Sequence, residues 1–156
     1  MGGTMKIRTY ISALAGAVAF GAFTSGAVSA EYTVVDGTIP ASLTGTPGDP
    51  LKGKAAAINR KKGNCLACHV MPIPEEQFHG DLGPELTEVG NNYSEAELRM
   101  RIVDPKVLND ETIMPAFLKP GTHDVLKKFK GKTILKPQEI EDIIAYLMTL
   151  KGSYSQ

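Results

Sequence analysis

The sequence predicts an all-α domain of a few helices preceded by an extended N-terminal arm. Apolar residues recur at helical spacing in three segments, and each of these segments has residues typical of helix caps. Little of the chain shows the alternating pattern of a strand. A length of 156 residues leaves room for one domain of ordinary size.

Residues 1–30 are expected to be a cleaved secretory signal peptide. Lys6 and Arg8 give a basic start, residues 11–23 are mostly apolar, and Ala30 ends a small-x-small cleavage pattern. The alternative is a membrane anchor, but the apolar run is short for a span of about 20 residues. Removal of Lys6 and Arg8 would leave 17 − 2 = 15 basic against 17 acidic side chains, a balance that does not suggest nucleic-acid binding.

Residues 31–49 are rich in Thr, Gly, Pro and Ser, so we expect an extended arm that is loose or lies on a partner. A first helix is expected to begin at Pro50, with Asp49 as its N-cap, and to end near Gly63. In this helix Gly53 and Ala57 would permit close crossing by a large side chain of the last helix, such as Tyr146.

Two later helices have stronger signals. Ser94-Glu95-Ala96-Glu97 is typical of a capping box, and Asp104-Pro105 should end the helix that follows it. Pro137 should begin the last helix and Gly152 should follow its end. The apolar face of the last helix consists of Ile140, Ile143, Ile144, Leu147 and Leu150.

Cys65-Leu66-Ala67-Cys68-His69 matches the attachment signature of c-type haem. Two cysteines three residues apart on a helical turn share a face, so both sulfurs can reach the vinyl groups of one porphyrin. His69 would then ligate the iron. The alternatives are a structural disulfide, which would close only a tight loop, and a thioredoxin-like redox pair, which needs a βαβ setting. One haem would use both cysteines of the chain.

A haem-ligating histidine usually donates its second ring N–H to a carbonyl. Gly83-Pro84 is a candidate, because a proline can present its carbonyl without a backbone N–H to satisfy. The alternative is an ordinary turn. Pro84 is therefore a candidate partner of His69, and the spacing alone favours neither interpretation.

Met114 is favoured as the second axial ligand. It lies in residues 112–117, which lack helical periodicity, and Pro115 favours an extended backbone at Met114. A thioether in this position would raise the reduction potential and close the iron to small ligands. The less favoured candidates are Met71, Met100 and Met148, together with His79 and His123, which are expected to be solvated residues of surface turns beside glycines.

Residues 119–136 are rich in lysine. A solvated surface is the favoured interpretation, and an electrostatic docking patch near the haem edge is the alternative. The lysines concerned are Lys119, Lys127, Lys128, Lys130, Lys132 and Lys136.

The order of these parts is similar to that of class I cytochromes c. Four segments also resemble SoxX, the small monohaem subunit of the SoxAX thiosulfate-oxidising complex. The likeness extends over about residues 50–150. The four segments are Gly63–His69, Leu82–Leu86, Thr112–Phe117 and Gln138–Ile143. A departure is Ala57, because cytochromes c often have a glycine about eight residues before the first cysteine.

The resemblance implies a class I cytochrome c-like domain in residues 50–156, with one covalent haem c ligated by His69 and Met114. It also implies a periplasmic heterodimer with a SoxA-like haem subunit. Such a complex couples thiosulfate to a cysteine of a carrier protein, and SoxX passes the released electrons to a mobile cytochrome. Because the haem uses both cysteines, we expect no catalytic residue for sulfur chemistry in this chain. The alternatives are a free-standing soluble electron carrier and an open-site haem sensor or peroxidase.

Overall fold

A computed structural model describes residues 1–2, 31–120 and 127–152 of the chain. The predicted signal peptide, apart from its first two residues, and His123 lie outside the described residues. Within them the fold is all-α, as expected, with one isolated bridge between Val35 and Thr38. The elements are α1 (Pro50–Ile58), η1 (Cys65–Ala67), α2 (Val89–Asn92), α3 (Glu95–Val103), η2 (Pro105–Val107), η3 (Lys127–Phe129) and α4 (Pro137–Leu147).

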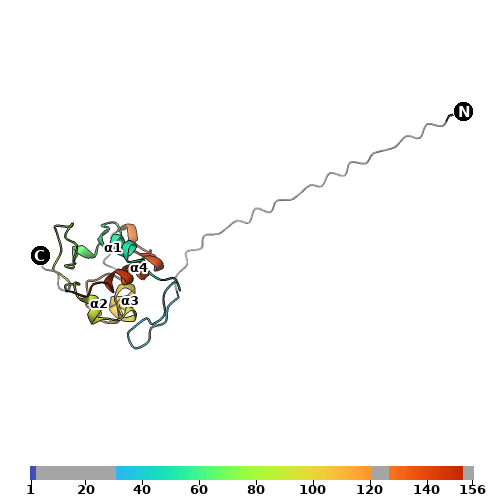
Figure 1. Cartoon of the computed structure of the whole chain (residues 1–156). Helices are drawn as coiled ribbons and strands as arrows, with labels where there is room; N and C mark the ends of the chain where they lie inside the picture. The colour runs from blue at the N-terminus through green and yellow to red at the C-terminus, as the bar shows by residue number, and fades with distance from the viewer. Residues whose placement is uncertain (3–30, 121–126, 153–156) are drawn as a thin grey trace.

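Helices α1 and α4 cross closely at the centre of the fold (Figure 1). Asp49 caps α1 as expected, because its carboxylate accepts the N–H groups of Leu51 and Lys52. The helix ends at Ile58 rather than near Gly63, since Asn59 is extended and its carbonyl accepts hydrogen bonds from the following turn. None of the helices in the described part of the chain is long and apolar enough to cross a membrane.

The crossing depends on Gly53. A Cβ added there would lie 1.9 Å from the carbonyl oxygen of Asp142, so only glycine lets the backbones of α1 and α4 approach this closely. The sequence predicted that Gly53 would make room for a side chain such as Tyr146; it instead makes room for the α4 backbone. Ala57 is fully buried in the same helix.

Helix α3 follows the predicted capping box. The Ser94 hydroxyl accepts the N–H of Glu97, and the Glu97 carboxylate accepts the N–H of Ser94. Asp104 ends the helix as predicted. Helix α4 begins at Pro137 as predicted but ends at Leu147, and Leu150 remains buried beyond it.

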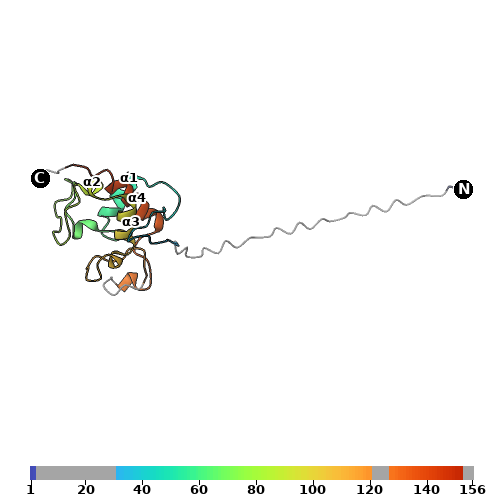
Figure 2. The ribbon, with the colours of Figure 1, turned by 90° about the horizontal axis from the view of Figure 1, so that it is seen from below.

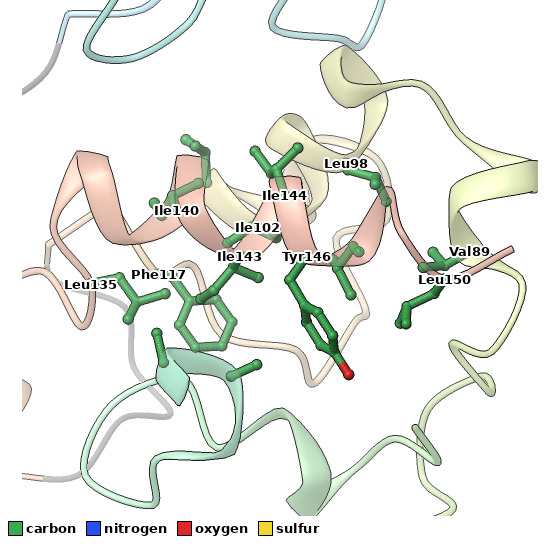
Figure 3. Close-up of a cluster of buried hydrophobic side chains, with 14 of the residues drawn as sticks. Val89, Leu98, Ile102, Phe117, Leu135, Ile140, Ile143, Ile144, Tyr146 and Leu150 are labelled. Atoms are coloured by element: carbon green, nitrogen blue, oxygen red, sulfur yellow. The ribbon is translucent and has the colours of Figure 1, made fainter. Parts of the chain in front are cut away.

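The core lies around α4, whose side chains Ile144 and Tyr146 point in opposite directions (Figure 3). Ile140, Ile143 and Ile144 of this helix are at most 1% exposed. Leu98 and Ile102 of α3 meet them from behind in the view of Figure 3. The described parts of the segment between α3 and α4, residues 104–120 and 127–136, gather on one side of the bundle, beyond α3 (Figure 2).

The extended arm, residues 31–49, is packed against its own chain, which corrects the expectation that it could be loose. Ile39 is fully buried, and its N–H donates to the carbonyl of Ala96 at 3.1 Å. The Arg99 guanidinium donates to the carbonyl of Ile39 at 2.8 Å, and the N–H of Leu43 donates to Glu141 at 2.8 Å.

Arg99 and Glu141 hold the arm as a bidentate ion pair between α3 and α4. Their two hydrogen bonds measure 2.8 and 3.0 Å. The two side chains are 3% and 5% exposed, so each charge depends on the other for its stabilisation. This pair therefore ties the arm to both helices that carry the core.

Candidate haem site

The attachment motif forms a tight turn directly before His69. Asn64 adopts a left-handed conformation with φ of 50° and begins the 3-10 helix η1. The N–H groups of Cys68 and His69 both donate to the carbonyl of Cys65, at 3.1 and 2.9 Å. The turn therefore presents Cys65, Cys68 and His69 to the same region of the molecule.

The environment of Cys65 does not suit a redox thiol. Burial raises the pKa of this thiol to about 11, a backbone hydrogen bond lowers it less, and nearby Cys68 adds to the rise. Cysteines of redox pairs have lowered pKa values, because the thiolate is the reactive form. The geometry therefore gives no support to the thioredoxin-like alternative.

His69 is oriented by Pro84. The Nδ1 atom of His69 lies 2.7 Å from the Pro84 carbonyl oxygen, which can only accept a hydrogen bond. Nδ1 must therefore carry the proton, which leaves the lone pair of Nε2 free to bind a metal.

Two glycines let residues 80–86, here called the proximal loop, lie against the attachment motif. A Cβ on Gly83 would lie 2.4 Å from Cε1 of His69, and one on Gly80 would lie 2.1 Å from the carbonyl oxygen of Ala67. Both N–H groups donate to the motif, Gly80 to Leu66 at 2.7 Å and Gly83 to Cys68 at 2.8 Å. The sequence indicated Gly83-Pro84 only as the source of a carbonyl. This packing was not expected, and its sequence signal is the pair of glycines three residues apart.

Met114 lies in residues 112–118, here called the Met114 strap. The strap is anchored downstream, where Phe117 and Leu118 donate to the carbonyls of Ile102 and Val103 at 3.1 and 3.4 Å. Upstream, the Lys106 ammonium donates to the carbonyl of Thr112 at 2.8 Å. The N–H of Met114 donates only to the Thr112 hydroxyl, at 3.2 Å, within the strap itself.

The other described candidate ligands pack in or against the core or make hydrogen bonds within the protein. Met71 and Met100 are fully buried in the core, and half-buried Met148 packs against it. His79 is not a solvated turn residue as expected: Nδ1 accepts the N–H of Met71 at 3.2 Å, and Nε2 lies 2.9 Å from the Glu76 carbonyl. His123 lies outside the described residues.

Two adjoining cavities lie between the motif and the strap, with volumes of about 270 and 340 Å³. The larger is lined by Cys68 and the proximal loop, and the smaller by apolar side chains of α3 and α4, such as Leu98, Ile102 and Ile143. Both are lined by Cys65, His69, Pro84, Thr112 and Met114.

These surroundings suit a haem c. Two thiols are available for attachment, an imidazole nitrogen and a thioether are available for iron, and the remaining walls are largely apolar. The described residues contain no group of three or more His, Cys, Asp or Glu side chains arranged for another kind of metal site. The sequence-predicted residues thus lie together around a space of suitable chemistry.

None of the described lysines of residues 119–136 lines either cavity. Lys119 pairs with buried Asp104 at 2.8 Å. The other described lysines of the segment are exposed, which agrees with a solvated surface. They are Lys127, Lys128, Lys130, Lys132 and Lys136.

The profile of the Cytochrome c family matches residues 51–151 of the chain. A chain in the crystal structure of SoxXA from P. pantotrophus is 38% identical, with a TM-score of 0.71, and the match covers 80% of this chain and 97% of that chain. Cytochrome c2 of Rhodopila globiformis is 35% identical over 115 residues, which are 67% of this chain and 96% of the relative.

An uncharacterized lipoprotein of Aquifex aeolicus (strain VF5) is 34% identical over 113 residues, or 64% of this chain. The match covers 49% of that relative, so the chain spans about half of its length. The family match, the likeness to the SoxXA structure and the all-α fold agree with one another. The chain belongs to the cytochrome c family and is a SoxX-type monohaem cytochrome whose cofactor is one covalently bound haem c.

Proposed function

We propose that this chain is the electron-accepting subunit of a periplasmic SoxAX-like complex that couples thiosulfate to a cysteine of a carrier protein. Its partner would be a SoxA-like haem subunit, and a mobile cytochrome would take its electrons. The likeness to a chain of a SoxXA structure supports the partner. A cleaved signal in residues 1–30 would bring the chain to the periplasm, where residues 31–49 would form the arm and residues 50–156 the haem domain.

In this proposal Cys65 and Cys68 hold the haem through thioether bonds, and His69 and Met114 are the axial ligands. The observation that carries the assignment is that His69 and Met114 line the same two cavities, with His69 Nε2 left free by the bond from Nδ1 to Pro84. When bound, the haem supplies a one-electron redox centre. The chain's own residues orient the imidazole, supply the thioether and exclude water with apolar walls.

The number of cysteines supports the assignment of the sulfur chemistry to another chain. The chain has two cysteines, and haem attachment would use both. No thiol would then remain to take part in a transfer of sulfur. The subunit would accept electrons, while its partner and the carrier protein would provide the groups that react with thiosulfate.

Ligation is tested with Met114→Ala in the haem-loaded chain. The proposal expects loss of the Met-to-iron charge-transfer band and the appearance of CO binding, because the thioether no longer closes the site. Wild-type protein that is high-spin in the ferric state and readily binds CO would instead support the sensor or peroxidase alternative. Met148→Ala is the matched control and should retain the band.

The complex is tested by affinity purification of the tagged chain from native periplasm. The purified material is mixed with thiosulfate and the carrier protein, and haem reduction is followed by absorbance. The proposal expects a haem-containing partner and reduction that disappears when the carrier cysteine is alkylated. Recovery of the chain alone, with a haem that these reagents do not reduce, would defeat the proposal and favour a free-standing electron carrier.

A further inference from the structure

Charge is distributed unevenly around the two cavities. The larger cavity, which Cys68 lines, has no lysine, arginine, aspartate or glutamate among its lining residues. The smaller cavity has a single charged lining residue, Arg101. Tyr93 and Asn109 line the same cavity and add polar groups to it.

Haem carries two propionate carboxylates on the edge of the macrocycle opposite its two vinyl groups. In a haem c the cysteines hold the vinyl edge, so the carboxylates must point away from them. Anionic groups in largely apolar surroundings need cationic or N–H partners. Arg101 is the only cationic lining group of the two cavities among the described residues. It lines the cavity that Cys68 does not line, whereas Cys65 lines both.

The guanidinium of Arg101 is held in position without using all of its donors. It stacks on the Tyr93 ring, with Cζ 4.0 Å from the ring centroid, and NH1 donates to the Glu97 carbonyl at 3.2 Å. Nε and NH2 have no hydrogen-bond partner in the described residues. A rigid fork of this kind is suited to a carboxylate.

Asn109 provides a second donor near the rim of the cavity. Its Oδ1 accepts the N–H of Glu111 at 3.1 Å, which leaves the Nδ2 amide without a partner among the residues described. The side chain is exposed, as expected for a group at the mouth of the cavity rather than in its wall.

We propose that Arg101 binds the haem propionates, with Asn109 as a secondary donor. Arg101 is then a binding residue of the haem rather than only a surface residue stacked on Tyr93. The inference uses the covalent haem and does not depend on the thiosulfate complex.

The charge of Arg101 has a direct effect on the reduction potential. A fixed cation near the haem favours the reduced form, which carries one positive charge fewer, so loss of the cation lowers the potential. A propionate deprived of its cation also has a raised pKa and takes up a proton as the pH falls. The reduction potential of the haem in the variant then rises on acidification, in a pH range where the wild-type potential is nearly constant.

Arg101→Gln in the haem-loaded chain is the decisive variant, measured by redox titration between about pH 5 and pH 8. We expect a lower potential at the alkaline end and a new rise towards acid pH. Lys52→Gln is the matched control, because it also removes one positive charge, but from a side chain that is 74% exposed and absent from the cavity lining. Arg101→Lys keeps the charge and should retain most of the wild-type potential.

Glu97 and Tyr93 are the titratable neighbours of Arg101. Variants of these two residues show whether they contribute to the pH dependence of the reduction potential. Glu97→Gln and Tyr93→Phe should not create the new pH dependence. If Arg101→Gln behaves like Lys52→Gln in both potential and pH profile, Arg101 is not a propionate partner. If Arg101→Gln does not yield holoprotein, Arg101→Met and Arg101→Lys replace it, and equal pH profiles of these two would equally overturn the proposal.

Discussion

The proximal loop and the Met114 strap both line the haem cavities, but the protein holds them in different ways. The proximal loop is bonded along its length to the attachment motif, through Gly80, Gly83 and Pro84, and to Val70 directly after the motif, through Leu86. The strap is fixed at its two ends, while Ile113, directly before Met114, is 68% exposed. The protein's own hydrogen bonds therefore orient His69, whereas Met114 lies on a segment that, among the described residues, is bonded to the rest of the fold only at its two ends. We expect ligation by Met114 to be lost first under stress and ligation by His69 to persist.

Phe117→Ala should have the largest effect, because it removes the buried side chain that anchors the strap. Deleting such a ring costs about 3–5 kcal/mol of unfolding free energy. In a denaturant titration followed at two wavelengths, the Met-to-iron band should be lost well before the haem absorption changes. Phe78→Ala, at a site 81% exposed, is the control and should change little. Simultaneous loss of both signals in Phe117→Ala would remove the distinction between the two sides.

Gly83→Ala tests the close packing of the proximal loop on His69. The added Cβ would lie 2.4 Å from the imidazole of His69, and crowding of this kind costs about 1–3 kcal/mol. Thermal unfolding and the visible spectrum of the holoprotein would show lower stability and altered ligation by histidine. Gly152→Ala serves as the control, because a Cβ there meets nothing within 4 Å. Equal stability of the two variants would show that the loop is not tightly packed on the ring.

His79→Ala tests the segment that leads from the motif to the proximal loop. The N–H of Met71 would lose its acceptor, and an unsatisfied buried donor costs about 1–3 kcal/mol. Chemical denaturation gives the size of the loss, while the Met-to-iron band should remain intact. Gln77→Ala, at the exposed neighbouring position, provides the baseline. Loss of the methionine band in His79→Ala would argue that the two sides are coupled.

Thr112→Val should have the smallest effect, because it removes one hydrogen bond inside the strap. We expect a stability loss of about 0.5–1.5 kcal/mol and a slightly faster exchange of Met114 for added imidazole. Thr112→Ser keeps the hydroxyl and should resemble the wild type. A valine variant with unchanged exchange kinetics would show that this bond does not hold the middle of the strap.

The sequence predicted local features of the fold well. Asp49, Ser94 with Glu97, and Pro137 each act within a few residues of themselves, so their roles can be read from spacing. The attachment motif and the Pro84 carbonyl are also close in the chain. These parts of the site could be predicted from the sequence because they depend on residues that are close to one another in the chain.

The features that sequence reasoning missed depend on distant partners. Arg99 bonds to Ile39 and Glu141, which are 60 and 42 residues away, and no local pattern links them. An extended arm with few apolar residues therefore gave no sign that it would pack on α3 and α4. The close contact at Gly53 likewise involves the backbone of α4, whereas the pattern of small residues indicated only that something large would lie nearby.

The packed arm has a consequence for the order in which the molecule can assemble. Residues 31–49 are synthesised before all of the described helices. The hydrogen bond from Leu43 to Glu141 can nevertheless form only after Glu141, 98 positions later, has been synthesised. Contacts this distant in sequence form late, because a long loop has to close first. The arm is thus among the earliest parts of the chain to be synthesised. We expect it to be among the last to fold, because it packs on α3 and α4 after these helices have packed against each other.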